Sequence, residues 1–312
     1  MSTVSQQAAY ATDISAFRHR APWDFSATGT RWRIYHSGQV DEEMARAIAA
    51  FVERDEQRWS RFRADSELSC LNRGAGGWQE VSAETFELLE ACERWRRQTG
   101  GVFQPLIGHV LRSWGYGDSS AERAPYAPQT PPPEPVVAHI ELDAARRAVL
   151  IPAGMALDLG GICKGWIAAR VAAFAVGCPD PRLLVDAGGD VLAVTGEHTV
   201  SLECSHRSAS ETWVRLRAGQ AVATSGHARR RWVNGDGREL HDLIDPYTGA
   251  PGPEAQATVV ADDPVAAEVL ATVLALRPKT IELTAYPALV TASGATSASA
   301  AWKRVLVPAF AV

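Results

Sequence analysis

The stretch DLGGICKGW, from Asp158 to Trp166, is the most informative part of this sequence. Its two glycines allow the backbone to approach a ligand closely, and the apolar run after it predicts a helix that begins near Lys164. The start of a helix carries unpaired N–H groups and positive partial charge, so it attracts anions. A lysine there is unfavourable for the helix itself, which indicates a negative group nearby. The alternative is a tight turn with a solvated lysine.

Outward from this turn, short strands alternate with separated blocks of helix. Apolar spacing predicts helices over residues 40–62, 82–101, 164–177 and 265–276, with Ser82 as an N-cap. Strand patterns cover residues 30–36, 181–194, 198–204, 212–218, 220–226 and 287–307, and residues 145–161 are expected to form strand, turn and strand. Strands outnumber βαβ repeats. The pattern therefore favours an α+β fold with antiparallel-rich sheets and packed helices.

The domain organisation is expected to be simple. Residues 1–25 are polar and are predicted to form a loose arm, and residues 26–312 a single compact domain. A proline-rich segment near residues 124–136 is expected to be a surface loop.

Composition and net charge exclude some classes of function and indicate a cellular compartment. The net charge of −5 gives no electrostatic case for nucleic-acid binding. The five scattered cysteines, without a CxxC pair, indicate free thiols in a reducing compartment. Because the chain shows neither a signal peptide nor a run of about 20 apolar residues, a cytoplasmic location without a membrane anchor is expected.

Three further stretches carry polar residues in suggestive places. LLVDAGGD (residues 183–190) runs from an apolar strand into carboxylates around two glycines, although a plain hairpin explains it equally well. HDLIDPYTG (residues 241–249) contains a type I turn signature, so Asp245 is either structural or placed at a site. Glu268 and Thr272 share one face of an apolar helix, where their oxygens suit Mg²⁺ unless that face is solvated.

Seven motifs follow one another in a fixed order: DSELSCLN (65–72), TGGVFQP (99–105), DLGGICKG (158–165), DAGGD (186–190), ATSG (223–226), LIDPYTG (243–249) and EVLAT (268–272). In this ordered set, spanning residues from about 25 to 310, the chain resembles the ApbE family, the FAD:protein FMN transferases. The resemblance implies an ApbE-like (T-fold-like) unit. It also implies Mg²⁺-dependent transfer of FMN from FAD to a threonine or serine hydroxyl of a target protein, with release of AMP.

The resemblance assigns roles to particular residues. The expected contacts with FAD are Thr28, Phe62, Val102, Phe103, Gln104, Asp158, Lys164, Ser225 and Ile244. The expected metal ligands are the carbonyl of Gly161 and the side chains of Glu268 and Thr272. His241 and Asp242 are the two candidates for the general base that accepts a proton from the target hydroxyl.

Several positions depart from the family pattern. Glu268 and Gln104 each stand where the family usually has aspartate, Cys163 replaces an alanine, and Asp242 occupies the usual position of a histidine. Two other functions therefore stay open: an FAD-binding relative that hydrolyses FAD to FMN and AMP without modifying a protein, and a non-enzymatic flavin carrier. SGAT (residues 293–296) resembles a flavin acceptor sequence, but Val290 replaces its expected aspartate, which favours an ordinary loop.

Overall fold

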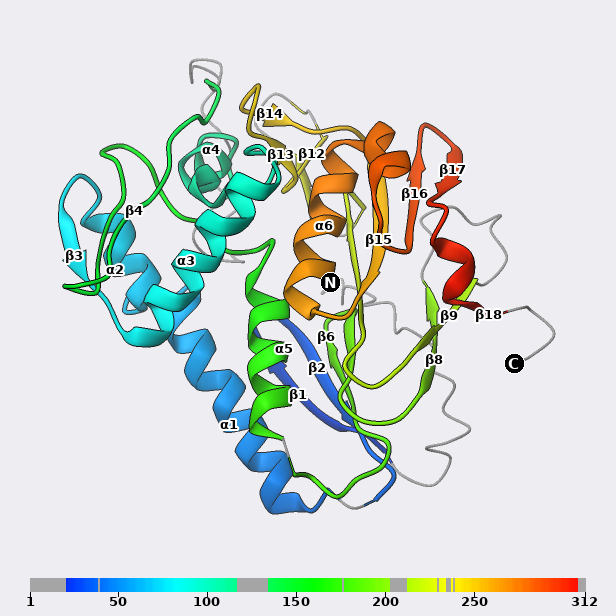
Figure 1. Ribbon diagram of the computed structural model, residues 1–312. Helices are drawn as coiled ribbons and strands as arrows, with labels where there is room; N and C mark the ends of the chain where they lie inside the picture. The colour runs from blue at the N-terminus through cyan, green and yellow to red at the C-terminus, as the bar shows by residue number, and fades with distance from the viewer. Residues whose placement is uncertain are drawn as a thin grey trace.

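A sheet of eight strands forms the centre of the molecule, and each neighbouring pair of its strands is antiparallel (Figure 1). The computed structural model describes residues 21–38, 40–116, 134–175, 177–202, 212–228, 230–233, 237 and 239–307. The strands, in their order across the sheet, are β1 (Trp23–Ala27), β2 (Thr30–Tyr35), β6 (Leu184–Ala187), β7 (Asp190–Ala193), β10 (Ala221–Gly226), β15 (Ala255–Ala261), β16 (Ala288–Ala292) and β17 (Ala295–Ala298). The predicted α+β class with antiparallel sheets is confirmed.

Both faces of the large sheet are buried at its centre. Successive side chains of a strand point to opposite faces, and the first two residues of β6, Leu184 and Val185, are apolar on both faces. Leu184 packs on one side with β8 (His198–Leu202) and β9 (Thr212–Leu216), whereas Val185 belongs to the larger core under the helices. This two-sided burial explains why Leu183, Leu184 and Val185 form a continuous apolar run before Asp186, instead of an alternating pattern.

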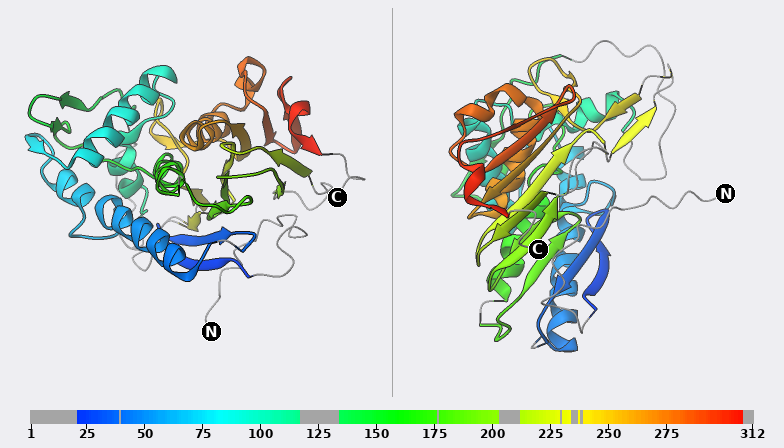
Figure 2. Two further views of the ribbon diagram at one scale, coloured as in Figure 1. Left: turned by 60° about the horizontal axis from the view of Figure 1, so that its bottom comes forward. Right: turned by 90° about the vertical axis from the view of Figure 1, so that its right-hand side faces the viewer.

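Three helices cover one face of the sheet. They are α1 (Glu42–Trp59), α5 (Cys163–Phe174) and α6 (Pro264–Leu276). Helix α6 packs on β10 and β15, α5 packs between α6 and α1, and the second view in Figure 2 looks onto the opposite face of the sheet. Asp41 and Asp263 cap α1 and α6 by accepting bonds from N–H groups in the first turn, whereas α5 has no such cap of its own.

Smaller elements complete the molecule. Beside the large sheet lie α2 (Glu67–Arg73), α3 (Ala83–Gln98), the 3₁₀ turn η2 (Pro105–Ile107), α4 (Gly108–Ser113) and a three-stranded sheet of β3 (Trp78–Glu80), β5 (Ala148–Leu150) and β4 (Glu141–Asp143). Two short ribbons pair β11 (Arg231–Val233) with β12 (Glu239–His241), and β13 (Ile244–Asp245) with β14 (Ala250–Pro251). At the C-terminal end are η3 (Pro278–Leu283), η4 (Trp302–Arg304) and β18 (Leu306–Val307), the last of which pairs with β9.

Most predicted elements are present, and the differences are local. Residues 302–304, within the expected strand region 287–307, form the 3₁₀ turn η4. The last residues of the expected arm, 23–25, belong to β1, because β2 gives them a partner. Residues 151–159 form no second strand after β5, since they instead lead to the turn before α5. The DSELSCLN motif forms α2, whose N-cap Ser66 accepts a bond from Ser69 N–H.

The predictions for the cysteines, the proline-rich loop and the N-terminal arm can be compared only with the residues that the structure describes. Cys70, Cys92, Cys163 and Cys178 are free thiols, as predicted, whereas Cys204 lies outside the described residues. Residues 124–133 of the proline-rich loop expected near 124–136 also lie outside them, as do residues 1–20 of the expected arm. In the SGAT stretch, Ser293 and Gly294 form the tight turn between β16 and β17, and Ala295 and Thr296 begin β17.

A glycine allows α5 to lie against the start of α6. A Cβ atom built on Gly165 would stand 2.5 Å from the carbonyl oxygen of Pro264 and 3.1 Å from Oε2 of Glu268. The carbonyl oxygen of Pro264 belongs to the backbone, so it cannot move aside by a side-chain rotation. Close approach of these two helix starts therefore requires a residue without a side chain at position 165.

Replacing Gly165 by alanine is expected to destabilise the fold. Alanine favours a helix by about 1 kcal/mol over glycine, but forcing a methyl group into a packed contact costs about 1–3 kcal/mol. At a separation of 2.5 Å from backbone the steric cost should win. Chemical unfolding should show a loss of about 1–2 kcal/mol. Ala173→Ser, an equally small change at an exposed position of α5, serves as the control. A Gly165→Ala variant as stable as the control would contradict the packing argument.

Candidate active site

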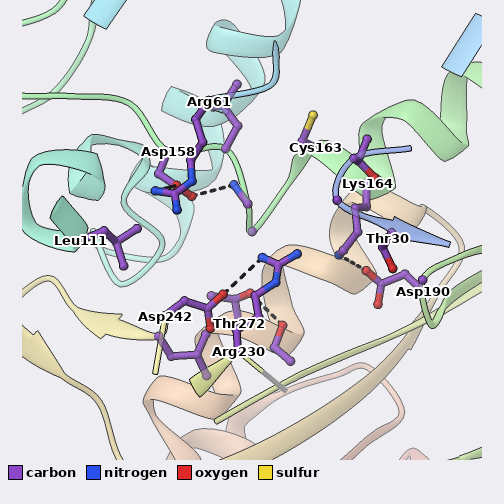
Figure 3. Close-up of a pocket in the computed structure, with 18 of the residues that line it drawn as sticks. Thr30, Arg61, Leu111, Asp158, Cys163, Lys164, Asp190, Arg230, Asp242 and Thr272 are labelled. Carbon is purple, nitrogen blue, oxygen red and sulfur yellow. Dashed lines mark hydrogen bonds and ion pairs between the residues drawn. The ribbon is translucent and has the colours of Figure 1, made fainter. Parts of the chain in front are cut away.

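A cavity of about 650 Å³ lies where the turn before α5, the β6–β7 hairpin, the end of β10 and helix α6 meet. Its volume falls in the range of small-molecule sites. All nine expected cofactor contacts line it: Thr28, Phe62, Val102, Phe103, Gln104, Asp158, Lys164, Ser225 and Ile244. Gly161, Thr272 and Asp242 line it as well. Segments separated by more than 200 residues are thus brought to one place, as the close-up in Figure 3 shows.

Lys164 is held by two carboxylates. Its Nζ donates to Oε1 of Glu268 at 2.5 Å and also to the carboxylate of Asp190. Burial by itself would lower the pKa of Lys164, but the charges of Asp190 and Glu268 outweigh it and raise the pKa above its usual value. The negative group that the lysine at a helix start requires is therefore this pair of carboxylates. The solvated-lysine alternative is wrong.

Glu268 also supplies the missing cap of α5. Its Oε2 accepts a bond of 2.7 Å from the backbone N–H of Gly165, in the first turn of α5. The carboxylate is only 1% exposed and does not line the cavity, so the idea of a solvated face of α6 is also wrong. Burial raises the pKa of Glu268, while Lys164 and the N–H of Gly165 oppose that shift.

Thr272 lines the cavity and places a hydroxyl oxygen there. Its Oγ1 lies 2.9 Å from Oγ of Ser225, and a Cβ on Gly161 would stand 3.4 Å from the same oxygen. The DLGGICKG turn, the ATSG stretch and helix α6 therefore meet at Thr272. The turn of α6 from Glu268 to Thr272 therefore joins the buried partner of Lys164 to the lining of the cavity.

Aromatic rings and an arginine form another wall. Asp158 accepts a bond of 2.9 Å from Gly160 N–H through Oδ1 and pairs with Arg61 at 3.3 Å through Oδ2. The guanidinium carbon of Arg61 lies 4.0 Å from the ring centroid of Tyr116 and 4.6 Å from that of Phe62. Such stacking is favourable between a cation and ring faces. The wall offers flat surfaces that suit a ring-containing ligand.

Asp242 faces the cavity and His241 does not. Asp242 pairs with Nη1 of Arg230 at 3.2 Å. His241 is buried, absent from the cavity lining, and sits edge-on to His227 with 6.1 Å between ring centroids. Burial lowers the pKa of His241 despite the nearby charge of Asp242. Of the two candidate bases, only Asp242 is placed to reach a ligand in the cavity.

The side chains of Gln104 and Asp245 both hold backbone segments in place. The amide nitrogen of Gln104 donates to the carbonyls of Val136 and Ala138, and its oxygen accepts from Leu106 N–H. Gln104 thus fixes the backbone beside the cavity. Asp245 pairs with Arg277 at 2.7 Å and accepts from Tyr247 N–H, which supports its structural reading as the start of a turn.

Sequence reasoning did not assign a role to Asp190, Arg61 or Arg230. The carboxylate of Asp190 had a signal, because it follows a glycine pair at the end of an apolar strand. The two arginines had none, since each belongs to a segment rich in charged residues. Cys163 lines the cavity, and nothing in the structure explains why it is a cysteine.

Fold and site together define an α+β protein with one large cavity walled by paired charges, hydroxyl oxygens and aromatic rings. The ApbE family model matches residues 28–288 of the chain. An FAD:protein FMN transferase from Klebsiella pneumoniae (strain 342) is 30% identical over 221 residues, covering 68% of this chain and 67% of the relative. One from Treponema pallidum (strain Nichols) is 26% identical over 251 residues, covering 71% and 67%. The chain therefore belongs to the ApbE family.

The solved structures agree with this family assignment. The crystal structure of the ApbE protein from Thermotoga maritima matches with a TM-score of 0.81 and 25% identity, over 92% of this chain and 99% of that one. The flavinyl transferase ApbE from Pseudomonas stutzeri, in its apo form, shares the fold with a TM-score of 0.74 at 20% identity, over 95% and 97%. Within the described part of the chain, no helix is both long and apolar enough to cross a membrane.

Replacing Lys164 by methionine should destabilise the protein strongly. The change leaves the buried carboxylate of Glu268 without its cation, and breaking a buried ion pair from one side typically costs about 3–5 kcal/mol. Chemical unfolding at pH 7 measures the loss. A double variant, Lys164→Met with Glu268→Gln, removes the stranded charge and should recover part of the stability. If Lys164→Met unfolds at the wild-type denaturant concentration, the carboxylates do not depend on the lysine.

Proposed function

We propose that this chain transfers FMN from FAD to a threonine or serine hydroxyl of a target protein and releases AMP. The observation that carries this proposal is the convergence of all nine expected FAD-contact positions on one cavity, in a chain of the ApbE family. Relatives at 30% and 26% identity are named FAD:protein FMN transferases. The cavity supplies cations and N–H groups, which suit a pyrophosphate, and ring faces, which suit a flavin or adenine.

The reaction joins the acceptor oxygen to the phosphorus of the FMN half. The bond between that phosphorus and the bridging oxygen breaks, and AMP leaves with the bond's electron pair. The proton of the acceptor hydroxyl passes to a base, for which Asp242 is placed in the cavity. Because phosphoryl transfer depends mainly on alignment and charge, Lys164 and the N–H groups of the DLGGICKG turn would orient the pyrophosphate and offset its charge.

We further infer that the site holds Mg²⁺. Glu268, Thr272 and the carbonyl of Gly161 supply hard oxygens of the kind that Mg²⁺ prefers, and Thr272 Oγ1 lies against Gly161. The described residues include no cluster of three His, Cys, Asp or Glu side chains placed for a metal, but one carboxylate with two neutral oxygens needs no such cluster. When bound, Mg²⁺ would neutralise pyrophosphate charge. Glu268 already binds Lys164, so the ion and the lysine would share this carboxylate.

The same inference extends to the partner and its compartment. A target protein with an exposed serine or threonine acceptor sequence is needed, and FAD is the second substrate. The four described cysteines are all free, which supports a reducing compartment such as the cytoplasm.

Incubating the purified chain with FAD and Mg²⁺, with and without a target protein carrying an Asp-x-x-Ser-Gly-Ala-Thr acceptor, tests the function. AMP should form only with the acceptor, and the acceptor should become fluorescent in a denaturing gel. AMP formed equally without acceptor would instead establish FAD hydrolysis. Tight FAD binding without AMP in either tube would identify a flavin carrier.

Replacing Thr272 by valine tests the metal ligands. Valine keeps the shape but removes the hydroxyl oxygen from the cavity, so the Mg²⁺ concentration for half-maximal AMP release should rise about tenfold or more, the effect of losing roughly 1.4 kcal/mol of metal binding. Direct titration with Mn²⁺, followed by electron paramagnetic resonance, gives a readout independent of turnover. Ser225→Ala, which removes the neighbouring hydroxyl, is the matched control. Unaltered Mn²⁺ affinity in the valine variant would place the metal elsewhere.

A further inference from the structure

Arg230 and Asp242 form an ion pair that belongs to the cavity wall. Arg230 lies between β10 and β11, and Asp242 follows β12, so the ribbon of β11 and β12 brings them together. Nη1 of Arg230 stands 3.2 Å from Oδ2 of Asp242. Figure 3 shows the guanidinium beside Thr272, between the wall that carries Asp158 and the wall that carries Lys164.

Among the cations that pair with a carboxylate of the cavity wall, Arg230 is the most accessible; Arg31 also lines the cavity and is 52% exposed, but its partner Asp24 does not line it. The side chain of Arg230 is 40% exposed, compared with 17% for Lys164, 14% for Arg33 and 12% for Arg61. Those three are held more deeply by carboxylates or by ring faces. A Cβ atom on Gly160 would stand 3.6 Å from Nη1 of Arg230, so the guanidinium also adjoins the DLGGICKG turn.

The charge of Asp242 creates an electrostatic conflict in this cavity. Asp158, Asp186 and Asp190 already line the cavity, and a pyrophosphate would bring further negative charge. A carboxylate facing that ligand repels it unless a cation cancels the charge. The guanidinium of Arg230 keeps its positive charge at every accessible pH. As a planar fork with five N–H donors, it can also hold a carboxylate in one orientation.

We propose that Arg230 is a positioning residue that cancels the charge of Asp242 and aims its carboxylate into the cavity, so that an anionic base can work beside an anionic dinucleotide. The inference rests on the proposed function, because it takes FAD as the ligand and Asp242 as the acceptor of the hydroxyl proton. In this proposal the two residues of the ion pair have different roles. Asp242 takes the proton, and Arg230 makes its presence compatible with substrate binding.

A charge-rescue cycle on FAD binding tests the proposal without needing turnover. FAD affinity is measured by quenching of flavin fluorescence without Mg²⁺ or acceptor, for wild type, Arg230→Gln, Asp242→Asn and the double variant. Arg230→Gln should weaken binding about tenfold, equivalent to about 1.4 kcal/mol, because Asp242 is left uncompensated. The double variant should bind within about threefold of wild type, since it restores the charge balance.

Transfer of FMN to the acceptor protein gives the second readout. Asp242→Asn and the double variant should lose transfer by about 100-fold or more, the usual contribution of a general base, although both bind FAD. Arg231→Gln is the matched control: the neighbouring arginine pairs with Glu239 and is not part of the cavity lining, so it should change neither readout.

Three results would overturn the proposal. Wild-type FAD affinity in Arg230→Gln would show that the arginine cancels no relevant charge. Equally weak binding in Arg230→Gln and the double variant would show a direct phosphate ligand instead of a partner for Asp242. Full transfer by Asp242→Asn would remove the base. Failure of the proposed function looks different, since wild type would then bind FAD and modify no acceptor, while the binding cycle could still be read.

Discussion

The carboxylate of Glu268 is the contact on which the rest of the site depends. One oxygen holds Lys164 and the other caps the first turn of α5 through the N–H of Gly165. A buried carboxylate is tolerated only when it is paired and hydrogen-bonded. Helix α5 supplies both partners, the ammonium group of Lys164 and the N–H of Gly165. The same bonds fasten α5 to α6, with Gly165 allowing the close approach. Anchoring the helix start in turn fixes the glycine turn before it, which forms one wall of the cavity.

Charge balance is the second constraint on this cavity. Its interior cations are each matched to carboxylates: Lys164 to Asp190 and Glu268, Arg61 to Asp158, Arg33 to Asp186, and Arg230 to Asp242. Paired charges keep their donors oriented at a low cost in free energy, so they are ready when a ligand brings its own charge. Asp242 stands where the family pattern has a histidine. A neutral imidazole needs no partner cation, whereas a carboxylate does, and Arg230 supplies it.

Much of the fold could be predicted because its elements are marked locally. Helix α1 has apolar residues at helical spacing behind the cap Asp41, and β6 and β7 flank a glycine pair. The strand predictions fail where the presence or absence of a neighbouring strand decides whether a segment forms a strand. Residues 23–25 join a strand only because β2 lies beside them, and residues 151–159 lack a strand partner despite apolar residues. In the site, the ordered motifs located the cavity-lining positions, but single arginines in charged segments carry no local mark.

The sequence by itself determined the α+β class, the family resemblance and most of the residues that line the cavity, since these follow from local pattern and from motif order. It left open which of His241 and Asp242 lines the cavity, which groups pair with Lys164, and whether Glu268 is buried. Only the tertiary structure decided them, because each depends on groups far apart in the chain. Lys164 meets a carboxylate 104 residues away, and the ribbon of β11 and β12 turns Asp242 toward the cavity while it buries His241. Distances of a few ångströms between such groups set charge and accessibility, and no local pattern encodes them.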